Sequence, residues 1–121
     1  MCFNGLTVVL DTPVNKLLEC QSTAQFCRDL IEEVIEAATA CGVSDIASDY
    51  ADGILEMTEQ MKPYSPSMKV DYDHHRPMEI YYLYTRPIEE ARKHSYDMKR
   101  IRMLEQQLRF IAALSRQEKI T

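Results

Sequence analysis

The stretch YSPSMKVDYDHHRPME, residues 64–79, interrupts a chain that otherwise reads as a series of amphipathic helices. It contains two prolines, Pro66 and Pro77, and proline is typical of the first turn of a helix, so we expect one helix to begin at each. Ser67 and Glu79 then stand just inside these two helix starts. Unpaired N–H groups and the helix dipole favour negative charge at such a start, which predicts a small anion-binding pocket between them.

The remaining sequence favours an all-α fold. Apolar residues recur at three- and four-residue steps, and no stretch alternates with a period of two. We expect a single helical domain, residues 1–121, of about six helices. The expected helical segments are 1–10, 14–20, 22–41, 45–61, 65–73, a segment from Pro77 that Pro87 kinks or splits, and 97–117.

Three of these segments carry specific expectations. The 22–41 helix, with Ser22 as its N-cap and Gly42 as its stop, is expected to be a central core helix. The 45–61 helix has its expected inner positions at Ile46, Tyr50, Ile54, Leu55 and Met57. The 1–10 helix has an apolar face made by Phe3, Leu6, Val9 and Leu10.

Composition excludes several classes of protein. With a formal net charge of −5, the chain is not expected to bind nucleic acid, which needs a basic face. The sequence contains no run of about 18 apolar residues, so no transmembrane helix is expected. The four cysteines form no Cys-x-x-Cys pair, and Cys27 and Cys41 fall on an apolar helix face, so we interpret them as small buried hydrophobes in a reducing, cytoplasmic protein.

Two segments of the opening stretch carry a family resemblance. Residues 64–71 and 76–80, read with the Ser67-to-Glu79 spacing, resemble the C-terminal helical domain of the ketopantoate reductases (2-dehydropantoate 2-reductases). The family has a Ser-Met-x-x-Asp turn and then Thr-Glu-Ile at a helix start. Two weaker matches, Asn4-Gly5-Leu6-Thr7 and the helix end at 36–42, follow the same order as in the family.

The resemblance implies a site for a 2-keto acid. In the family an NADPH-binding Rossmann domain precedes this domain, and the reaction belongs to pantothenate biosynthesis. A lysine on the helix between the two domains donates a hydrogen bond to the substrate carbonyl. Carried over by position, Asn4 and Ser67 contact the substrate, and Ser67 binds the carboxylate of the substrate. Glu79 is the acidic catalytic partner. The resemblance implies no metal and no cofactor-binding residue in these 121 residues.

The sequence departs from the family pattern in ways that affect function. It contains no Gly-x-Gly-x-x-Gly, and the lysine that the family has two turns before Asn4 would lie before Met1. We therefore expect NADPH only for a full-length member and no reductase activity from this chain alone. Without a Rossmann partner the apolar face of residues 1–10 would be uncovered, which predicts a homo-oligomer or a complex with such a domain.

Each candidate residue also has an ordinary structural interpretation. Ser67 and Glu79 are residue types common in a first helical turn, and Asn4 could face solvent on a helix end. Asp71 and Arg76 are expected to form an ion pair that pins the loop.

A pair of histidines in the stretch and three tyrosines just after it are also given a structural interpretation. The His74-His75 pair does not favour a metal site, because neighbouring loop residues point in different directions. Of the three tyrosines at 81, 82 and 84, at least one is expected in the core. The alternative function is a non-catalytic helical interaction module that keeps the fold.

Overall fold

The computed structural model describes the backbone of residues 1–59 and 65–120 and the side chains of residues 1–58 and 65–115. This part of the chain is helical and contains no strand, so the expected all-α class is confirmed. Its seven α-helices and one π-turn are α1 (Cys2–Val9), α2 (Val14–Glu19), α3 (Gln21–Ala40), α4 (Tyr50–Glu59), α5 (Ser67–Asp73), η1 (Tyr81–Thr85), α6 (Arg86–Lys93) and α7 (Lys99–Ile120). Tyr64, which opens the stretch quoted above, lies outside the described residues.

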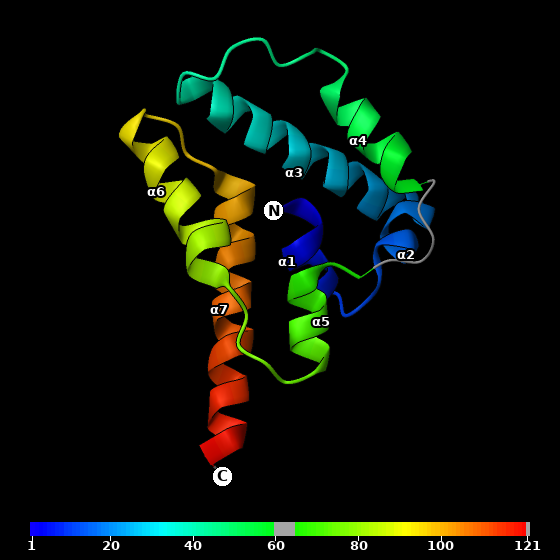
Figure 1. Ribbon diagram of the computed structural model, residues 1–121, viewed down its shortest axis with the longest axis vertical. Helices are drawn as coiled ribbons and strands as arrows, with labels where there is room; N and C mark the ends of the chain where they lie inside the picture. Colours follow the sequence, from blue (N-terminus) through cyan, green and yellow to red (C-terminus); the bar gives the residue numbers. More distant parts are fainter. Residues whose placement is uncertain (60–64, 121) are drawn as a thin grey trace.

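The short helix α1 lies in the middle of the molecule, with α3 and α4 above it and α7 and α5 on either side (Figure 1). It contacts α2, α3, α5 and α7. Leu6 and Val8 are buried, and Phe3 and Val9 are half-buried, so only Leu10 of the apolar face stays exposed. The expectation that this face is largely uncovered is therefore wrong, because helices of the same domain cover it.

The helix α3 is long and central, as expected, since it contacts α1, α2, α4, α6 and α7. Its start differs from the prediction: Cys20 is the N-cap, and Ser22 is the second helical residue. The Thr23 hydroxyl donates to the carbonyl of Leu17 (2.5 Å) and to that of Cys20 (3.2 Å). These bonds close the junction between α2 and α3, so α3 begins without a side-chain cap from Ser22.

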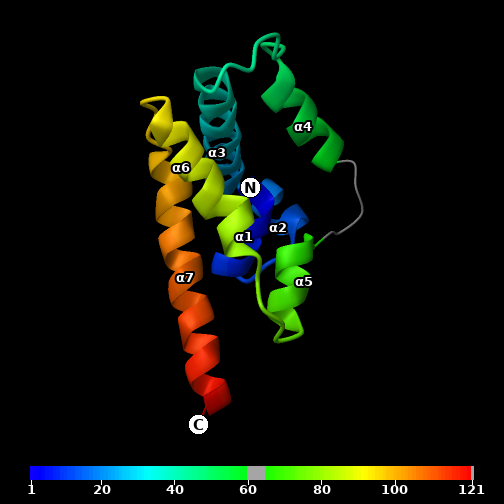
Figure 2. The same ribbon diagram turned by 60° about the vertical axis from the view of Figure 1, so that its left-hand side comes forward.

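The helix α4 is shorter and less buried than predicted. It begins at Tyr50 rather than at residue 45, after a non-helical segment in which Asp45 has a φ of 69°. Tyr50 and Met57, two of the expected inner positions, are exposed, and Ala51 is the residue that is buried. The helix contacts α3 and lies beside it at the upper right of the molecule in Figure 2.

The segment after Pro77 does not become helical at the proline. Residues 76–79 are irregular, helix begins at Ile80, and its first turn is the π-turn η1, directly before Arg86-Pro87. Proline lacks an N–H and its ring clashes with the carbonyl four residues earlier, and a wider π-turn relieves that clash. The predicted interruption at Pro87 thus takes the form of a π-turn.

Tyr84, in this π-turn, joins the second half of the chain to α1. Its side chain is fully buried, and its phenol oxygen accepts a hydrogen bond from the Gly5 N–H (2.7 Å) and donates one to the Met1 carbonyl. Burial raises the pKa of Tyr84 well above its usual range, so the phenol stays protonated and keeps this donor. One of the three tyrosines is therefore a core residue, as predicted.

A buried carboxylate from α3 holds the start of α7. Glu33 is 5% exposed and accepts hydrogen bonds from the backbone N–H of Arg100 (3.0 Å) and of Ile101 (2.7 Å). These are among the N–H groups that a helix start leaves without an intrahelical partner, and the helix dipole favours a negative charge there. α7 begins at Lys99, two residues later than predicted.

We predict that Tyr84→Phe lowers the free energy of unfolding by about 1–3 kcal/mol, because it leaves the buried Gly5 N–H without its acceptor. Urea unfolding followed by circular dichroism measures the change. Tyr82→Phe is the matched control, since the Tyr82 side chain is exposed and the substitution keeps its ring. Equal midpoints for the two variants would contradict the assigned role of the phenol.

We predict that Glu33→Gln destabilises the fold by about 1–3 kcal/mol, because one of the two N–H groups at the start of α7 would then face an amide NH₂. Glu32→Gln on the same helix is the control, because Glu32 is exposed and the ion pair that it forms with a described residue, Arg28, spans 3.9 Å. A Glu33→Gln midpoint within the error of the control would show that the cap contributes little.

Candidate functional site

Asn4 lies on α1 and reaches the start of α5. Its side-chain oxygen Oδ1 accepts a hydrogen bond from the backbone N–H of Met68, 3.2 Å away. Its amide group Nδ2 donates to none of the described residues, and the side chain is half-buried. Asn4 therefore serves as a cap for α5 supplied from 64 residues away, and its NH₂ group keeps both N–H donors for another partner.

Ser67 is the first residue of α5, next to the Met68 N–H that Asn4 holds. Its side chain is exposed, and its hydroxyl forms no hydrogen bond with the described residues. Pro66 precedes it as the N-cap with an extended backbone. Two of the predicted site residues, Asn4 and Ser67, are thus brought to the same end of one short helix.

Lys69 holds α5 in place. Its ammonium group is bound by Asp11 (2.8 Å) and by Asp73, and it lies 5.4 Å from the centre of the Tyr72 ring. Burial lowers the pKa of Lys69, but the hydrogen bonds to the two aspartates outweigh it, so the pKa stands above its usual value. Because Asp11 follows α1, this contact fixes α5 against the end of α1.

The loop after α5 is held by the ion pair that the sequence predicts. The Arg76 guanidinium donates to the Asp71 carboxylate (3.0 Å), and the Arg76 backbone N–H donates to the Asp71 carbonyl (2.8 Å). The His74 ring nitrogen Nδ1 lies 2.8 Å from the Val70 carbonyl. No three His, Cys, Asp or Glu side chains of the described residues are placed to hold a metal ion.

Glu79 lies at the other end of this loop, just before the π-turn. Its Oε1 accepts a hydrogen bond from the Tyr82 N–H (3.3 Å), so it acts as a cap for the turn. The side chain is exposed, and Oε2 accepts no hydrogen bond from the described residues. The carboxylate therefore keeps an oxygen available for a ligand.

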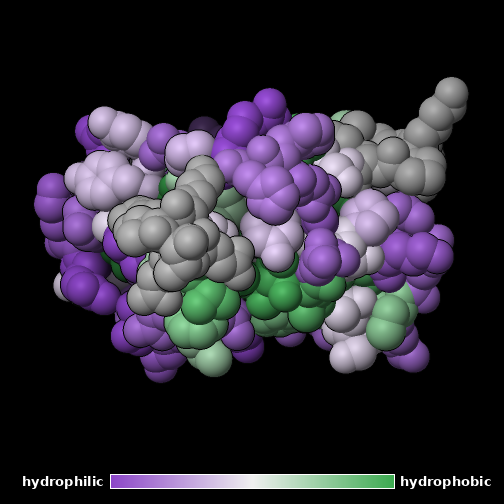
Figure 3. Space-filling view, turned by 90° about the horizontal axis from the view of Figure 1, so that it is seen from below, coloured by the Kyte–Doolittle hydropathy of each residue, from purple (hydrophilic) through white to green (hydrophobic). Residues whose placement is uncertain are grey.

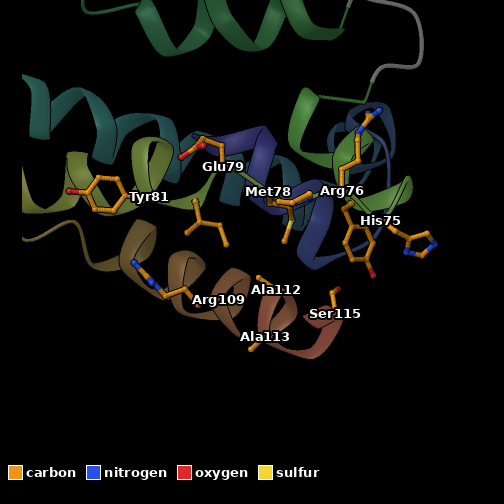
Figure 4. A pocket seen from close by; sticks show the side chains of 12 residues that line it. His75, Arg76, Met78, Glu79, Tyr81, Arg109, Ala112, Ala113 and Ser115 are labelled. Atoms are coloured by element: carbon orange, nitrogen blue, oxygen red, sulfur yellow. The ribbon is translucent and has the colours of Figure 1, made fainter. Parts of the chain in front are cut away.

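Glu79 also lines a cavity of about 660 Å³ between the loop and the C-terminal half of α7 (Figure 4). In this view Met78 and Ala112 lie toward the middle, while the ends of the Arg76 and His75 side chains point outward. The lining residues are Tyr72, His75, Arg76, Pro77, Met78, Glu79, Ile80, Tyr81, Arg109, Ala112, Ala113 and Ser115. The cavity thus has an apolar middle and a polar rim.

The lining of this cavity does not include Asn4 or Ser67. The structure therefore brings Asn4 and Ser67 together, whereas Glu79 faces a cavity at the other end of the loop. The predicted anion pocket assumes two helix starts that share one space, and this cavity is not formed in that way. The second helix starts at Ile80 rather than at Pro77, beyond Glu79 rather than before it.

Sequence reasoning missed Arg109, whose side chain contributes to the cavity from α7. It donates to the Thr85 hydroxyl (2.5 Å) and lies 3.7 Å from the Glu105 carboxylate. Its only sequence signal is the Glu-to-Arg spacing of four residues, which is typical of a helix-surface pair. Neither that spacing nor any other local pattern shows that the loop after α5 lies opposite α7.

No helix in the described part of the chain is long and apolar enough to span a membrane.

Comparisons with known proteins agree on one family. The model of the family described as "Ketopantoate reductase PanE/ApbA C terminal" matches residues 1–112. A 2-dehydropantoate 2-reductase from Nostoc sp. is 32% identical over 119 residues, which are 98% of this chain and 37% of that protein. This chain therefore spans little more than a third of the length of the curated relative it matches.

Solved structures lead to the same result. The crystal structure of 2-dehydropantoate 2-reductase from Geobacter metallireducens superposes with a TM-score of 0.85 at 36% identity, covering 89% of this chain and 36% of that one. The structure of the dimeric ketopantoate reductase from Staphylococcus aureus shares the fold, with a TM-score of 0.81 at 20% identity over 93% of this chain and 39% of that one. The chain belongs to the ketopantoate reductase family, of which it matches the helical C-terminal domain.

Proposed function

We propose that this chain is the substrate-binding helical domain of an NADPH-dependent reductase of the 2-dehydropantoate 2-reductase type, acting on a 2-keto acid. The single observation that carries the proposal is the family match over residues 1–112. In this proposal the NADPH-binding domain, and the lysine that donates to the substrate carbonyl, come from outside these 121 residues. The four cysteines are all free, which favours a reducing compartment such as the cytoplasm.

The contacts around α5 support a role for Ser67 and Asn4 in holding the substrate carboxylate. The Ser67 hydroxyl and the Asn4 amide nitrogen donate to none of the described residues, and the first turn of α5, whose Met68 N–H Asn4 holds, lies beside them. Hydrogen bonds to an ionised acceptor are shorter and stronger than those between neutral groups. Lys69, although close in sequence, is already bound by two aspartates, so it is not proposed as a substrate ligand.

The proposed role of Glu79 is to hold the hydroxyl end of the substrate. One carboxylate oxygen caps the π-turn and fixes the side chain, and the other accepts no hydrogen bond from the described residues. An ionised carboxylate is an acceptor, so it suits a hydroxyl or an ammonium group but not a second carboxylate. This polarity assigns opposite ends of a hydroxy-keto acid to Ser67 and to Glu79.

The residues of this chain do not form the usual binding site for NADPH. A dinucleotide pyrophosphate is usually held by a glycine-rich turn between a strand and a helix. The described residues contain no strand, and the sequence contains no Gly-x-Gly-x-x-Gly. No step of the reaction is therefore assigned to NADPH on this chain.

A second candidate function is a non-catalytic interaction module that has kept the fold. In both candidates we propose that the chain associates with a second protein surface, either another copy or a Rossmann domain. The S. aureus relative that shares the fold is dimeric. Exposed apolar side chains just after α1 and on α7 favour association of this kind.

We predict that the chain binds ketopantoate or pantoate and that Ser67→Ala weakens this binding about tenfold or more. The substitution removes one hydrogen bond to a charged acceptor, which contributes about 1.5–3 kcal/mol. Isothermal titration calorimetry of the 121-residue chain measures the dissociation constants.

Ser22→Ala is the matched control, because Ser22 is an exposed serine in the first turn of another helix, α3. Weakening by Ser67→Ala but not by Ser22→Ala would support the substrate-binding domain. No binding of either acid by the wild-type chain would instead favour the interaction module.

We predict no steady oxidation of NADPH by the purified 121-residue chain with ketopantoate, because its residues lack a site for the cofactor. The absorbance of NADPH followed over time measures this. The positive control is a full-length reductase of the family under the same conditions. Turnover above the rate without protein would contradict the proposal that the cofactor domain lies outside these residues.

A further inference from the structure

The cavity between the loop after α5 and α7 has one end at which charged side chains from two elements gather. Glu79 lies toward this end from the loop, and Arg109 lies toward it from α7 (Figure 4). The Glu79 oxygen Oε2 accepts no hydrogen bond from the described residues. Arg109 is fixed by Thr85 and Glu105, but both contacts use only Nη2 of its five-donor guanidinium. Both side chains therefore keep hydrogen-bonding groups for a ligand.

These two charges suit a hydroxyl group better than an ion. A carboxylate only accepts hydrogen bonds and a guanidinium only donates them, whereas a hydroxyl can donate to the first and accept from the second. A ligand carboxylate would be repelled by Glu79, and a ligand ammonium by Arg109. Arg109 is therefore a second contact for the substrate hydroxyl that the proposed function assigns to Glu79.

The middle of the cavity is apolar and wide. Pro77 and Met78 line it from the loop, and Ala112 and Ala113 line it from α7. Because an alanine side chain ends at Cβ, α7 leaves space opposite Met78. Pockets of about 300–1,000 Å³ bury most of the surface of a drug-sized ligand. The volume of about 660 Å³ is thus larger than a small hydroxy-keto acid with two methyl groups would fill.

The domain has a second apolar region, but that region carries no charge to orient a small ligand. A groove of about 540 Å³ between α1 and α7 has no charged side chain among its described lining residues. Seen from the end where α7 protrudes, hydrophobic residues form a band along one edge of the molecule (Figure 3). Ligand sites are mostly apolar with a few polar groups that fix orientation, and the cavity at Glu79 meets both conditions.

We propose that this cavity is the subsite for the hydroxyl-bearing end of the substrate, and that it accepts a bulky apolar group. The hydroxyl lies between Glu79 and Arg109, and the apolar group, such as a phenyl ring, lies between Met78 and Ala112. The substrate class is then 2-keto acids that carry a large apolar group next to a hydroxyl. The subsite belongs to the substrate-binding role proposed above and depends on it.

The test compares three hydroxy-keto acids by isothermal titration calorimetry with the 121-residue chain. They are 4-hydroxy-2-oxobutanoate, which has no apolar branch, ketopantoate, which has two methyl groups, and 4-hydroxy-2-oxo-4-phenylbutanoate. The phenyl acid is expected to bind about tenfold or more tightly than ketopantoate, because the ring buries more apolar surface. Ser67→Ala is expected to weaken all three acids alike, since they share the carboxylate.

Ala112→Leu fills the middle of the cavity. It is expected to weaken binding of the phenyl acid about tenfold and to leave 4-hydroxy-2-oxobutanoate within about twofold of the wild type. Ala24→Leu is the matched control, because Ala24 is a half-buried alanine on another helix, α3, and does not line the cavity. Circular dichroism and urea midpoints check that both variants keep the fold.

Arg109→Met tests the contact with the hydroxyl. It is expected to weaken 4-hydroxy-2-oxo-4-phenylbutanoate about tenfold, and 2-oxo-4-phenylbutanoate, which lacks the hydroxyl, much less. If Arg109 only supported the loop and α7, the variant would weaken both acids by the same factor. The comparison therefore separates a contact with the ligand from a structural role.

The subsite and the proposed function fail in different ways. Binding of none of the three hydroxy-keto acids would overturn both. Binding of ketopantoate with no gain from the phenyl ring would overturn the subsite alone. The same holds for an Ala112→Leu variant that binds the phenyl acid as well as the wild type, or an Arg109→Met variant that does not distinguish the acids with and without the hydroxyl.

Discussion

The close approach of Tyr84 to Gly5 is the constraint on which the arrangement of the helices depends. A side chain at position 5 would place its Cβ 2.5 Å from the Tyr84 phenol oxygen and 2.9 Å from a methyl group of Leu104. Because glycine has no Cβ, the phenol can lie against the backbone of α1 and bond to two of its groups. One contact therefore brings together α1, the π-turn and α7, which are far apart in the sequence.

The position of Ser67 in the candidate site also depends on α1. Asn4, next to Gly5 on α1, binds the start of α5, and Asp11, just after α1, binds Lys69 on α5. The position of Ser67 is thus set by two contacts from α1 rather than by its own neighbours. Glu79 is set differently, through the Asp71–Arg76 ion pair and the turn at Tyr82. The two ends of the proposed substrate would therefore be held by separately supported residues.

The long helix α7 serves three surfaces at once. Its buried side packs against α1 and α3, a second side closes the cavity at Glu79, and a third side carries the exposed apolar residues Met103, Phe110 and Leu114. Its C-terminal half extends beyond the other helices (Figures 1 and 2), and two of the described side chains there, Phe110 and Leu114, are exposed. A helix that protrudes in this way is well placed to join the domain to another protein surface, whether or not the domain takes part in catalysis.

The sequence by itself determined the all-α class, most of the helices and the family. Helical periodicity is a local property, proline acts on its own turn, and the Ser67-to-Glu79 spacing lies within one short stretch. The Asp71–Arg76 ion pair was predictable for the same reason, since its members are five residues apart.

Only the tertiary structure decided how the helices end and what they bring together. Glu33 caps a helix start more than 60 residues away, and Asn4 does the same for α5, so no local pattern could show either contact. The predicted cap at Ser22 and the predicted helix start at Pro77 were wrong because local preferences of about 1 kcal/mol are easily outweighed by packing. The coverage of α1 and the cavity that Glu79 lines against α7 likewise follow from where the chain folds back, which depends on contacts between distant residues.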